Sequence, residues 1–443
     1  MKVLGIVVEY NPFHNGHAYH LKKSIELTGA DYVIAVMSGN FIQRGEPAII
    51  NKWARCRQAL LCGVDLVIEL PVVYAMASAE YFAFGAIKLL DSLGVTDFIC
   101  FGSENGRIDD LEQIADILVK EPEEYKMLLK ENISKGISYP SARDESLRAF
   151  LKKSGLQRNI PMEILKTSNN ILGIEYLKAL KQLKSSIKPY TILRINNSYN
   201  SEKLSGEISS ATSIRHSVKE YLNEAGKLLN TAEPGKLFHT AFHDSSGHVS
   251  FSFQDAMPEA SAKIMLQEFI HGRGPVLPNN FLQVLLAYLR MIPSDKLKQH
   301  VYIGEGLENR IKEASGQSRT IEELINNICT KRYAKTRINR ILFNTLIGVT
   351  SGDVKAFNEN GGPQYIRILG FNKKGRELLS VIDKKASLPI ITKFADYTKY
   401  KNNPLLNRMI EIETIATDIY VLGYPGKEYR TGGQDYTQGI VIV

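Results

Sequence analysis

The stretch VVEYNPFHNGHAYHLKK, residues 7–23, passes from an apolar segment into a helical pattern and places histidines at the junction. The preceding run VLGIVV has the continuous apolar character of a buried parallel strand. The first turn of a helix carries unpaired N–H groups and a partial positive charge, so it attracts anions. His14 and His17 add imidazole donors there, and Gly16 allows a ligand to approach closely. We therefore predict a strand–turn–helix unit that binds an anion such as phosphate.

A metal site is the alternative for clustered histidines, because histidines at helical spacing also ligate zinc. No carboxylate or cysteine stands at a matching spacing nearby. We therefore predict no metal ligands in this stretch.

The same alternation of apolar runs and helical patterns continues along the chain. The strand-like runs are residues 3–8, 32–37, 65–70 and 97–102, and the helix-like segments between them are 16–28, 52–62 and 74–93. This rhythm predicts an α/β fold with a doubly wound parallel sheet, whose ligands bind at the carboxyl ends of the strands.

Two changes in pattern suggest the domain organisation. Strand-like runs give way to helical patterns over about 109–185, which predicts a helical insertion, and a further strand is expected at 190–195. Loop-forming residues cluster around 230–247, and strand-like and helical segments resume beyond them, with strands expected at 365–371 and 388–394. We expect a catalytic domain over 1–225 and a C-terminal mixed α/β domain over 235–443.

Composition is that of an ordinary globular protein, with 44% hydrophobic and 23% charged residues. We find neither a membrane-spanning run nor a signal peptide, so we expect a cytoplasmic protein without a membrane partner. Four widely spaced cysteines suggest reduced thiols. The net charge of +8 favours polyanionic partners slightly.

A second motif stands near the end of the expected catalytic domain, in ISSATSIRHSV, residues 208–218. Alone, it reads as an ordinary Ser/Thr cap before a helix. HNGH matches the HxGH motif of the nucleotidyltransferase superfamily, and the second motif resembles the ISSTxIR-type signature that closes the same domain. The resemblance implies that Ser210, Thr212 and Arg215 hold the β- and γ-phosphates of ATP.

Longer segments narrow the family. They are GIVVEYNPFHNGH (5–17), MSGNFIQRGEPAIINKWARCRQAL (37–60), FGSENG (101–106), NNILGIEYLKAL (169–180) and TKRYAKTRINRILFNTLIG (330–348). Together, and in this order, they resemble the bacterial tRNA(Met) cytidine acetate ligase family. The resemblance implies an enzyme that activates acetate with ATP as acetyl-adenylate. It then transfers the acetyl group to the wobble cytidine of elongator tRNA(Met), giving N4-acetylcytidine.

The resemblance also implies roles for individual residues, with His14 and His17 catalytic. The implied ATP-binding residues are Val7, Val8, Glu9, Tyr10, Asn11, Pro12, Phe13, His14, Asn15, Gly16, His17, His20, Gly102, Asn169, Arg194, Ser210, Thr212 and Arg215. Gly102 would leave room for the adenine or ribose. The family often has proline where Ser168 stands, so the matching asparagine is 169 or 170.

Three further features stand near the expected catalytic edge. Ser38 and Asn40 follow the second strand and are possible acyl or crevice contacts. Lys52 and Arg55 share a helix face, which is either solvated or in contact with phosphate. The loop 43–45 (Gln-Arg-Gly) lies at the catalytic end of the sheet, and its role is open.

The segment 330–348 combines an apolar stripe at helical spacing with five basic residues and no acid. The basic residues are Lys331, Arg332, Lys335, Arg337 and Arg340. A charged face is normally only solvated, but an acid-free one suits phosphate contact. We predict tRNA binding here.

The expected substrates are thus ATP, acetate and elongator tRNA(Met), with Mg²⁺ bound through the phosphates. One alternative is a small-molecule nucleotidyltransferase with an accessory domain, whose product would retain AMP. The other is a non-catalytic RNA-binding protein with a relic nucleotide fold.

Overall fold

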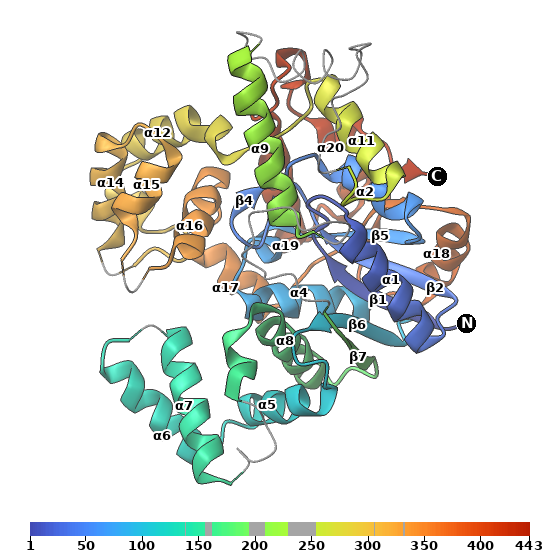
Figure 1. Ribbon diagram of the computed structural model, residues 1–443, viewed down its shortest axis with the longest axis vertical. Coiled ribbons are helices and arrows are strands. Elements are labelled where there is room, and N and C mark those ends of the chain that lie inside the picture. The colour runs from blue at the N-terminus through green and yellow to red at the C-terminus, as the bar shows by residue number, and fades with distance from the viewer. Residues whose placement is uncertain (138, 156–161, 195–208, 229–253, 305, 331–332) are drawn as a thin grey trace.

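The structure is a computed structural model that describes residues 1–137, 139–155, 162–194, 209–228, 254–304, 306–330 and 333–443. Its centre is one mostly parallel sheet in the order β10-β8-β5-β2-β1-β6-β7, with β9 paired to β8 (Figure 1). The strands are β1 (Val3–Val8), β2 (Tyr32–Ser38), β5 (Leu66–Leu70), β6 (Phe98–Ser103), β7 (Lys188–Leu193), β8 (Ile366–Phe371), β9 (Ile390–Ile391) and β10 (Val441–Ile442). A short antiparallel hairpin, β3 (Phe41–Ile42) and β4 (Glu46–Pro47), stands apart from it.

The strand order reverses next to β1. The chain runs from β1 outward through β2 to β5 on one side, and returns to place β6 and β7 on the other side, with every one of these pairs parallel. The carboxyl ends of β1 and β6 therefore flank a topological switch point, where doubly wound sheets bind ligands. The predicted mixed α/β class with a mainly parallel sheet is confirmed.

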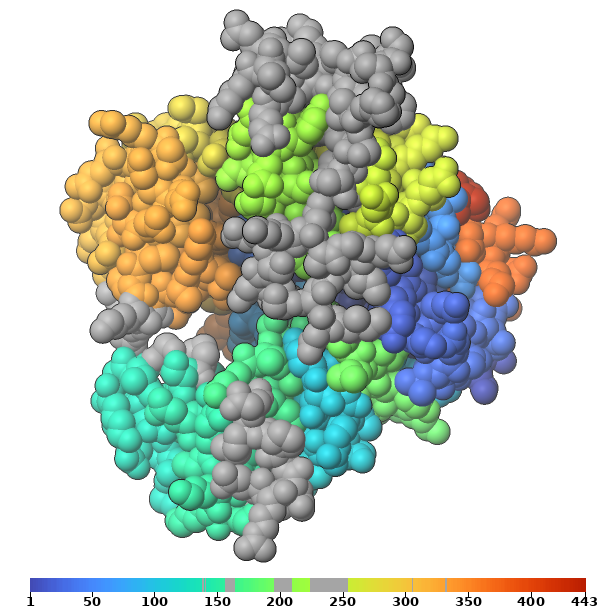
Figure 2. Space-filling model, viewed as in Figure 1, coloured from blue at the N-terminus to red at the C-terminus, as the bar shows by residue number. Residues whose placement is uncertain are grey.

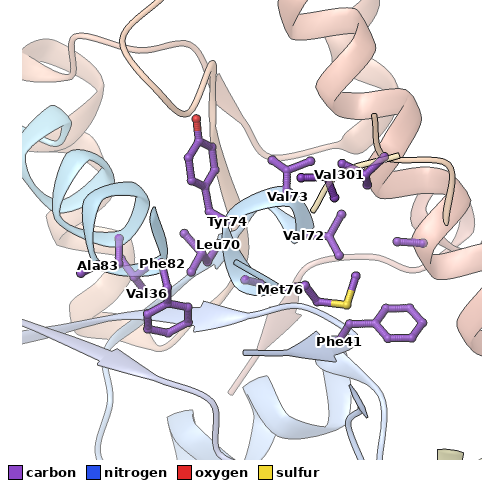
Figure 3. Close-up of a cluster of buried hydrophobic side chains, with 14 of the residues drawn as sticks. Val36, Phe41, Leu70, Val72, Val73, Tyr74, Met76, Phe82, Ala83 and Val301 are labelled. Carbon is purple, nitrogen blue, oxygen red and sulfur yellow. The ribbon is translucent and has the colours of Figure 1, made fainter. Parts of the chain in front are cut away.

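Helices cover both faces of the sheet. Successive side chains of each strand point to opposite sides, so both faces carry apolar side chains that must be packed. Leu4, Ile6 and Ala35 pack with residues of α1 (Asn15–Thr28) and α2 (Lys52–Leu61). On the other face, Val36 and Leu70 pack against Phe82 and Ala83 of α4 (Ala79–Ser92) and against α3 (Val72–Ala75) (Figure 3). Val301, from far along the chain, lies in the same cluster. One apolar core therefore spans the sheet and the C-terminal helices.

Helices fill the segment between β6 and β7. They are α5 (Ile108–Lys120), α6 (Glu123–Ser134), α7 (Tyr139–Lys153), the 3-10 turn Met162–Lys166 and α8 (Ser168–Gln182). α8 returns to pack on α4 and α5 beneath the sheet, while α6 and α7 form a separate lobe in Figure 1.

The rest of the chain is largely helical. Its helices are α9 (Ala211–Leu228), α11 (Glu259–Ile270), α12 (Leu282–Met291), α13 (Ser294–Leu297), α14 (Leu307–Gln317), α15 (Ile321–Ile328), α16 (Lys335–Ile347), α17 (Ser351–Glu359), α18 (Lys373–Lys385), α19 (Pro404–Val421) and α20 (Gln434–Thr437), with 3-10 turns at Pro278–Phe281, Phe394–Tyr400 and Lys427–Tyr429. No helix of the described residues is long and apolar enough to cross a membrane.

The C-terminal strands join the N-terminal sheet. The strand expected at 365–371 is present as β8, but it pairs antiparallel with β5 and continues the sheet, with β10 on its far side. The strand expected at 388–394 is reduced to Ile390–Ile391. Pairing partners far apart in sequence leave no local signal, so the spacing of apolar residues could not reveal this union. The division into domains near residue 230 stays a prediction, but the sheet crosses it.

Candidate functional site

The loop after β1 turns into α1 at the switch point, and two histidines order it. His14 caps the helix, with its Nδ1 accepting a hydrogen bond from the Gly16 amide at 3.0 Å. The His14 amide donates to Nδ1 of His17 at 3.3 Å, and the two ring centroids are 3.7 Å apart. Because both Nδ1 atoms accept, the ring proton of each neutral histidine lies on Nε2. The pair therefore presents two Nε2–H donors.

Burial keeps these imidazoles neutral. It lowers the pKa of His14 to about 3 and that of His20 to about 4, and it also brings the pKa of His17 well below its usual value. The nearby positive charge of Arg194 lowers all three further. The same positive charges that disfavour protonation of these histidines favour the binding of an anion.

The first amides of α1 are already paired, which differs from the expectation of free helix-start donors. The Asn15 amide donates to the Ala256 carbonyl at 2.9 Å, and the His17 amide donates to the His14 carbonyl at 2.8 Å. The His14 ring takes the Gly16 amide. In this conformation the donors offered to an anion are side chains, together with the dipole of the helix.

Arg194 follows β7 and lies over the end of β6. A Cβ atom on Gly102 would come within 3.1 Å of Cγ of Arg194, so the missing side chain accommodates the arginine stem. The Arg194 amide donates to the Ser103 carbonyl at 3.0 Å. Gly102, expected to make room for the nucleotide base or sugar, makes room for Arg194 in this conformation.

Two asparagines at the start of α8 pin the loop after β6. Buried Asn170 accepts from the amides of Glu104 and Asn105 at 2.9 and 3.1 Å. Asn169 donates through Nδ2 to Glu104 Oε1 at 2.6 Å and is only half-buried. Asn170 therefore has a structural role, and Asn169 remains the candidate for ligand contact.

The second motif meets the first in space. Ser210 caps α9, with its Oγ accepting from the Ser213 amide at 3.1 Å, as the simpler interpretation of that motif expects. Arg215 donates to the Asn11 carbonyl at 2.8 Å and to the Thr212 hydroxyl at 3.4 Å. Residues about 200 positions apart in the chain thus share one edge of the sheet.

Asn40 and Ser38, the two predicted acyl or crevice contacts near β2, differ in their hydrogen bonds. Asn40 is buried, accepting from the Lys52 amide at 2.9 Å and donating to Thr417 at 3.3 Å, so it is a structural residue. Ser38 is also buried, and within the described part of the chain its Oγ has no hydrogen-bond partner. Ser38 stays a candidate for ligand contact.

Lys52 and Arg55, expected to be solvated or to contact phosphate, are fully buried. Arg55 donates to the carbonyls of Ile50 at 3.1 Å, Glu9 at 2.6 Å, Ser38 at 3.0 Å and Gly39. Burial lowers its pKa to about 10, so it stays charged at neutral pH. Arg55 fixes the ends of β1 and β2 through carbonyl groups, a role that helical spacing could not indicate.

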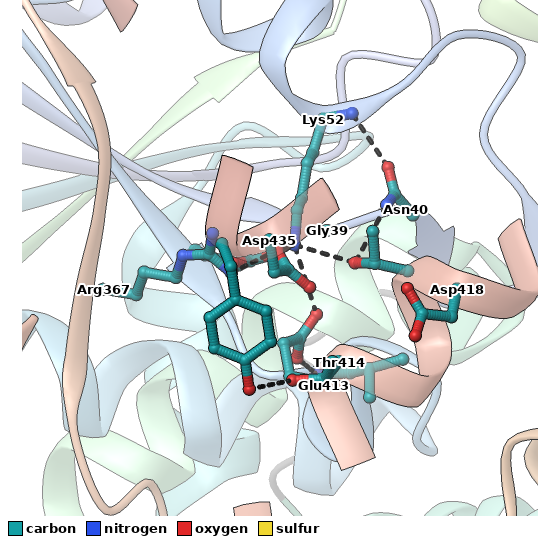
Figure 4. A network of polar contacts seen from close by, with 12 residues as sticks. Gly39, Asn40, Lys52, Arg367, Glu413, Thr414, Asp418 and Asp435 are labelled. Carbon is teal, nitrogen blue, oxygen red and sulfur yellow. Dashed lines mark hydrogen bonds and ion pairs between the residues drawn. The ribbon is translucent and has the colours of Figure 1, made fainter. Parts of the chain in front are cut away.

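Lys52 belongs to a buried ionic network at the end of β2 and β5 (Figure 4). Its Nζ lies 2.8 Å from Glu69 and 2.7 Å from Asp435, and Arg367 contacts the same two carboxylates at 2.9 and 2.6 Å. Glu413 lies 3.8 Å from Lys52. This network was not predicted from the sequence. The sign of it in the sequence was Glu69 inside the apolar run DLVIEL, because a buried carboxylate requires a partner.

The basic segment forms α16, whose apolar stripe is buried as its spacing predicted. Lys335 is exposed, and the guanidinium of Arg337 lies 4.5 Å from the ring centre of Tyr333. Arg340 is half-buried, and Lys331 and Arg332 lie outside the described residues. In Figure 2 the α14–α16 lobe and the α6–α7 lobe project from the same side of the molecule, with a gap between them.

The described residues contain no group of three His, Cys, Asp or Glu side chains that could hold a metal ion. A divalent ion at this edge would need ligands from a bound anion or from water.

Comparisons with known proteins agree with this geometry. Residues 1–435 match the model of the HIGH Nucleotidyl Transferase family. The chain is 51% identical to the tRNA(Met) cytidine acetate ligase of Acetivibrio thermocellus and 45% identical to that of Caldanaerobacter subterraneus, over the full length of both chains in each case. It superimposes on Thermotoga maritima TmcAL bound with alpha-thio ATP with a TM-score of 0.87, at 38% identity over all of both chains.

Proposed function

Because this chain belongs to the tRNA(Met) cytidine acetate ligases of the HIGH nucleotidyl transferase family, we propose that it joins acetate to the wobble cytidine of elongator tRNA(Met), using ATP. It is a ligase, and its nucleotide site is the edge of the sheet between β1 and β6. The observation that carries the proposal is the pair of neutral histidines, both with Nδ1 engaged and Nε2–H available.

In the first step, an acetate oxygen attacks the α-phosphorus of ATP and pyrophosphate leaves, which gives acetyl-adenylate. Negative charge on the phosphate oxygens must be stabilised as the bond to the leaving group breaks. The Nε2–H donors of His14 and His17 serve this role, and Arg194 and Arg215 supply the positive charge beside them. Binding of the polyphosphate then raises the histidine pKa values towards their usual range.

In the second step, the cytidine N4 amine attacks the acetyl carbon. The bond from that carbon to the phosphate oxygen breaks, AMP leaves and N4 loses a proton. The mixed anhydride is already reactive, so correct placement of the amine supplies much of the rate. Mg²⁺ would be bound here largely through phosphate oxygens and water, because the described residues offer no group of three His, Cys, Asp or Glu side chains for it.

The tRNA lies on the α16 side of the molecule in this proposal. Lys335 and Arg337 are placed to contact phosphates, and Arg340 stands behind them. The ring of Tyr333 beneath Arg337 holds that guanidinium in position.

The decisive experiment supplies the protein with ATP, labelled acetate and tRNA, and then digests the RNA. We expect labelled N4-acetylcytidine and one AMP per acetyl group, both dependent on ATP and both lost in His14→Ala. If AMP instead remained in a small phosphorylated product, the protein would be a small-molecule nucleotidyltransferase. Tight RNA binding unaffected by His14→Ala, with no turnover in the wild type, would identify a non-catalytic RNA-binding protein.

A further inference from the structure

The turn of the β3–β4 hairpin, residues 43–45, connects the nucleotide edge to α16. The Gln43 amide donates to Oε1 of Glu9 at 2.8 Å. Glu9 directly precedes the loop that leads to His14 and His17. The carbonyl of the same residue accepts from Nη1 of Arg340 at 3.3 Å. One peptide segment therefore joins a carboxylate at the end of β1 to a basic side chain of α16.

Gly45 allows the two backbones to touch. Its φ of 73° lies in the left-handed region, and a Cβ atom there would overlap the Arg340 amide and come within 2.6 Å of the Arg340 Cα atom. Next to it, Asn339 of α16 donates to Oε1 of Glu46 at 3.1 Å. At Gly45, therefore, main chain meets main chain with no side chain in between.

The hairpin is also held from its apolar side. The ring of Phe41 packs on Phe343 of α16 and on Tyr420 of α19, with centroid distances of 5.6 and 5.9 Å. A displacement of α16 must therefore move the hairpin with it, and the turn of the same hairpin is bonded to Glu9 through the Gln43 amide.

Glu9 is a junction of the nucleotide edge. Its own carbonyl accepts from Arg55 at 2.6 Å. Burial raises the pKa of its carboxyl group, and the positive charges of Arg215, Arg44 and Arg55 partly oppose this rise. The position of Glu9 is thus coupled to the arginine that contacts Asn11 in the histidine loop.

We propose that the turn Gln43–Gly45 is a positioning element for acyl transfer. It fixes an RNA docked on α16 relative to the loop that carries His14 and His17. The proposal rests on the function proposed above. The turn takes no part in adenylate formation. In the transfer step it sets the approach of N4 to the acetyl carbon while AMP leaves and the N4 proton departs.

The test is Gly45→Ala, which introduces a methyl group against the α16 backbone. The matched control is Gly348→Ala at the other end of α16. Gly348 has a φ of 86°, and a Cβ atom there would have no neighbour within 4 Å. Both changes strain a left-handed residue, but only the first one displaces the turn from the helix.

Three measurements separate the steps. Acetate-dependent exchange of pyrophosphate into ATP reports adenylate formation, and it is run with tRNA(Met) carrying uridine at the wobble position. Binding of tRNA reports docking, and single-turnover acetylation reports transfer. For Gly45→Ala we expect exchange and binding within about threefold of wild type and transfer reduced about 100-fold, as for a misplacement of about 1 Å. Gly348→Ala should match the wild type in all three.

If exchange fell in parallel with transfer in a folded Gly45→Ala protein, or if transfer were unchanged, the proposal would be overturned. If that variant did not fold, Glu46→Ala, which removes only the hydrogen bond from Asn339, carries the same test with a smaller expected loss of transfer. A wild-type protein without exchange or acetylation would refute the proposed function itself, an outcome distinct from failure of the inference.

Discussion

At the scale of single residues, the chemistry depends on which nitrogen of each histidine carries the proton. His14 and His17 use Nδ1 as an acceptor inside the loop, so the loop itself sets the direction of the Nε2 donors. The short spacing HNGH makes this possible, because a helix cap and the residue at the third helical position lie next to each other. Residue type and spacing together predict this arrangement.

His17→Ala removes one donor from the position where phosphate charge develops. We expect adenylate formation to fall by about 10²–10³-fold, the usual effect of losing one such donor. Acetate-dependent pyrophosphate exchange measures it. Affinity for tRNA should stay near the wild-type value, and a comparable loss of both in a folded variant would contradict the division between the two surfaces.

The depressed histidine pKa values predict a loss of stability in mild acid. The pKa of His14 is about 3 in the folded chain and about 6.5 when unfolded, so below pH 6.5 the unfolded state binds a proton that the folded state does not. Stability therefore decreases as pH falls through this window, by about 1.4 kcal/mol per pH unit for a fully buried histidine.

His14→Asn isolates this effect, because asparagine also caps a helix but does not titrate. Urea unfolding at pH 7 and pH 5 should show that the variant loses about 2 kcal/mol less than the wild type over that interval. Equal losses in the two proteins would mean that folding does not lower the pKa of His14.

At the scale of elements, one face of α16 is buried in the apolar core, and the other face carries basic side chains. Ile338 and Ile341 are fully buried, while Lys335 is exposed and Arg337 stacks on Tyr333. The apolar period predicted the buried face. It could not reveal that Arg340 turns to the carbonyl of Gln43, since that contact depends on a hairpin almost 300 residues earlier.

Replacing Lys335 and Arg337 by alanine should weaken tRNA binding, because fewer RNA phosphates are then neutralised by the protein. The slope of log K against log salt concentration should become shallower by about 1 for each phosphate that is no longer neutralised. Filter binding at several salt concentrations measures it. Lys384→Ala is the control, since this exposed lysine lies on α18, far from α16 in Figure 1. An unchanged slope in the double variant would place the tRNA elsewhere.

At the scale of the whole molecule, a buried ionic network ties the C-terminal segment to the sheet. Lys52 and Arg367 lie among Glu69, Glu413 and Asp435 (Figure 4). Burial raises the pKa of Glu413 well above its usual value, and Glu69 adds to this effect. Asp435 is equally buried, but Arg367 and Lys52 keep its pKa low. Within this network, burial therefore favours the protonated form of Glu413, whereas the two cations favour the ionised form of Asp435.

These opposite shifts predict unequal effects for two isosteric changes. Glu413→Gln replaces the carboxyl group whose protonated form burial favours, and it should change the unfolding free energy at pH 7 by less than about 1 kcal/mol. Asp435→Asn removes the carboxylate that contacts both buried cations and should cost about 3–5 kcal/mol. Chemical denaturation of both variants measures the difference. Equal destabilisation would show that Glu413 is ionised.

Local sequence was sufficient to predict the strand–turn–helix unit, the histidine pair, the parallel strands β1, β2, β5, β6 and β7, and the buried stripe of α16. These features follow from short-range spacing, because the periods of helix and strand and the chemistry of a helix start act over a few residues. The folded chain was needed to show that β8 joins β5, that Lys52 and Arg55 are buried, and that the turn 43–45 contacts α16. Each of these depends on a partner distant in the chain, and burial of a charge becomes favourable only when that partner is in place.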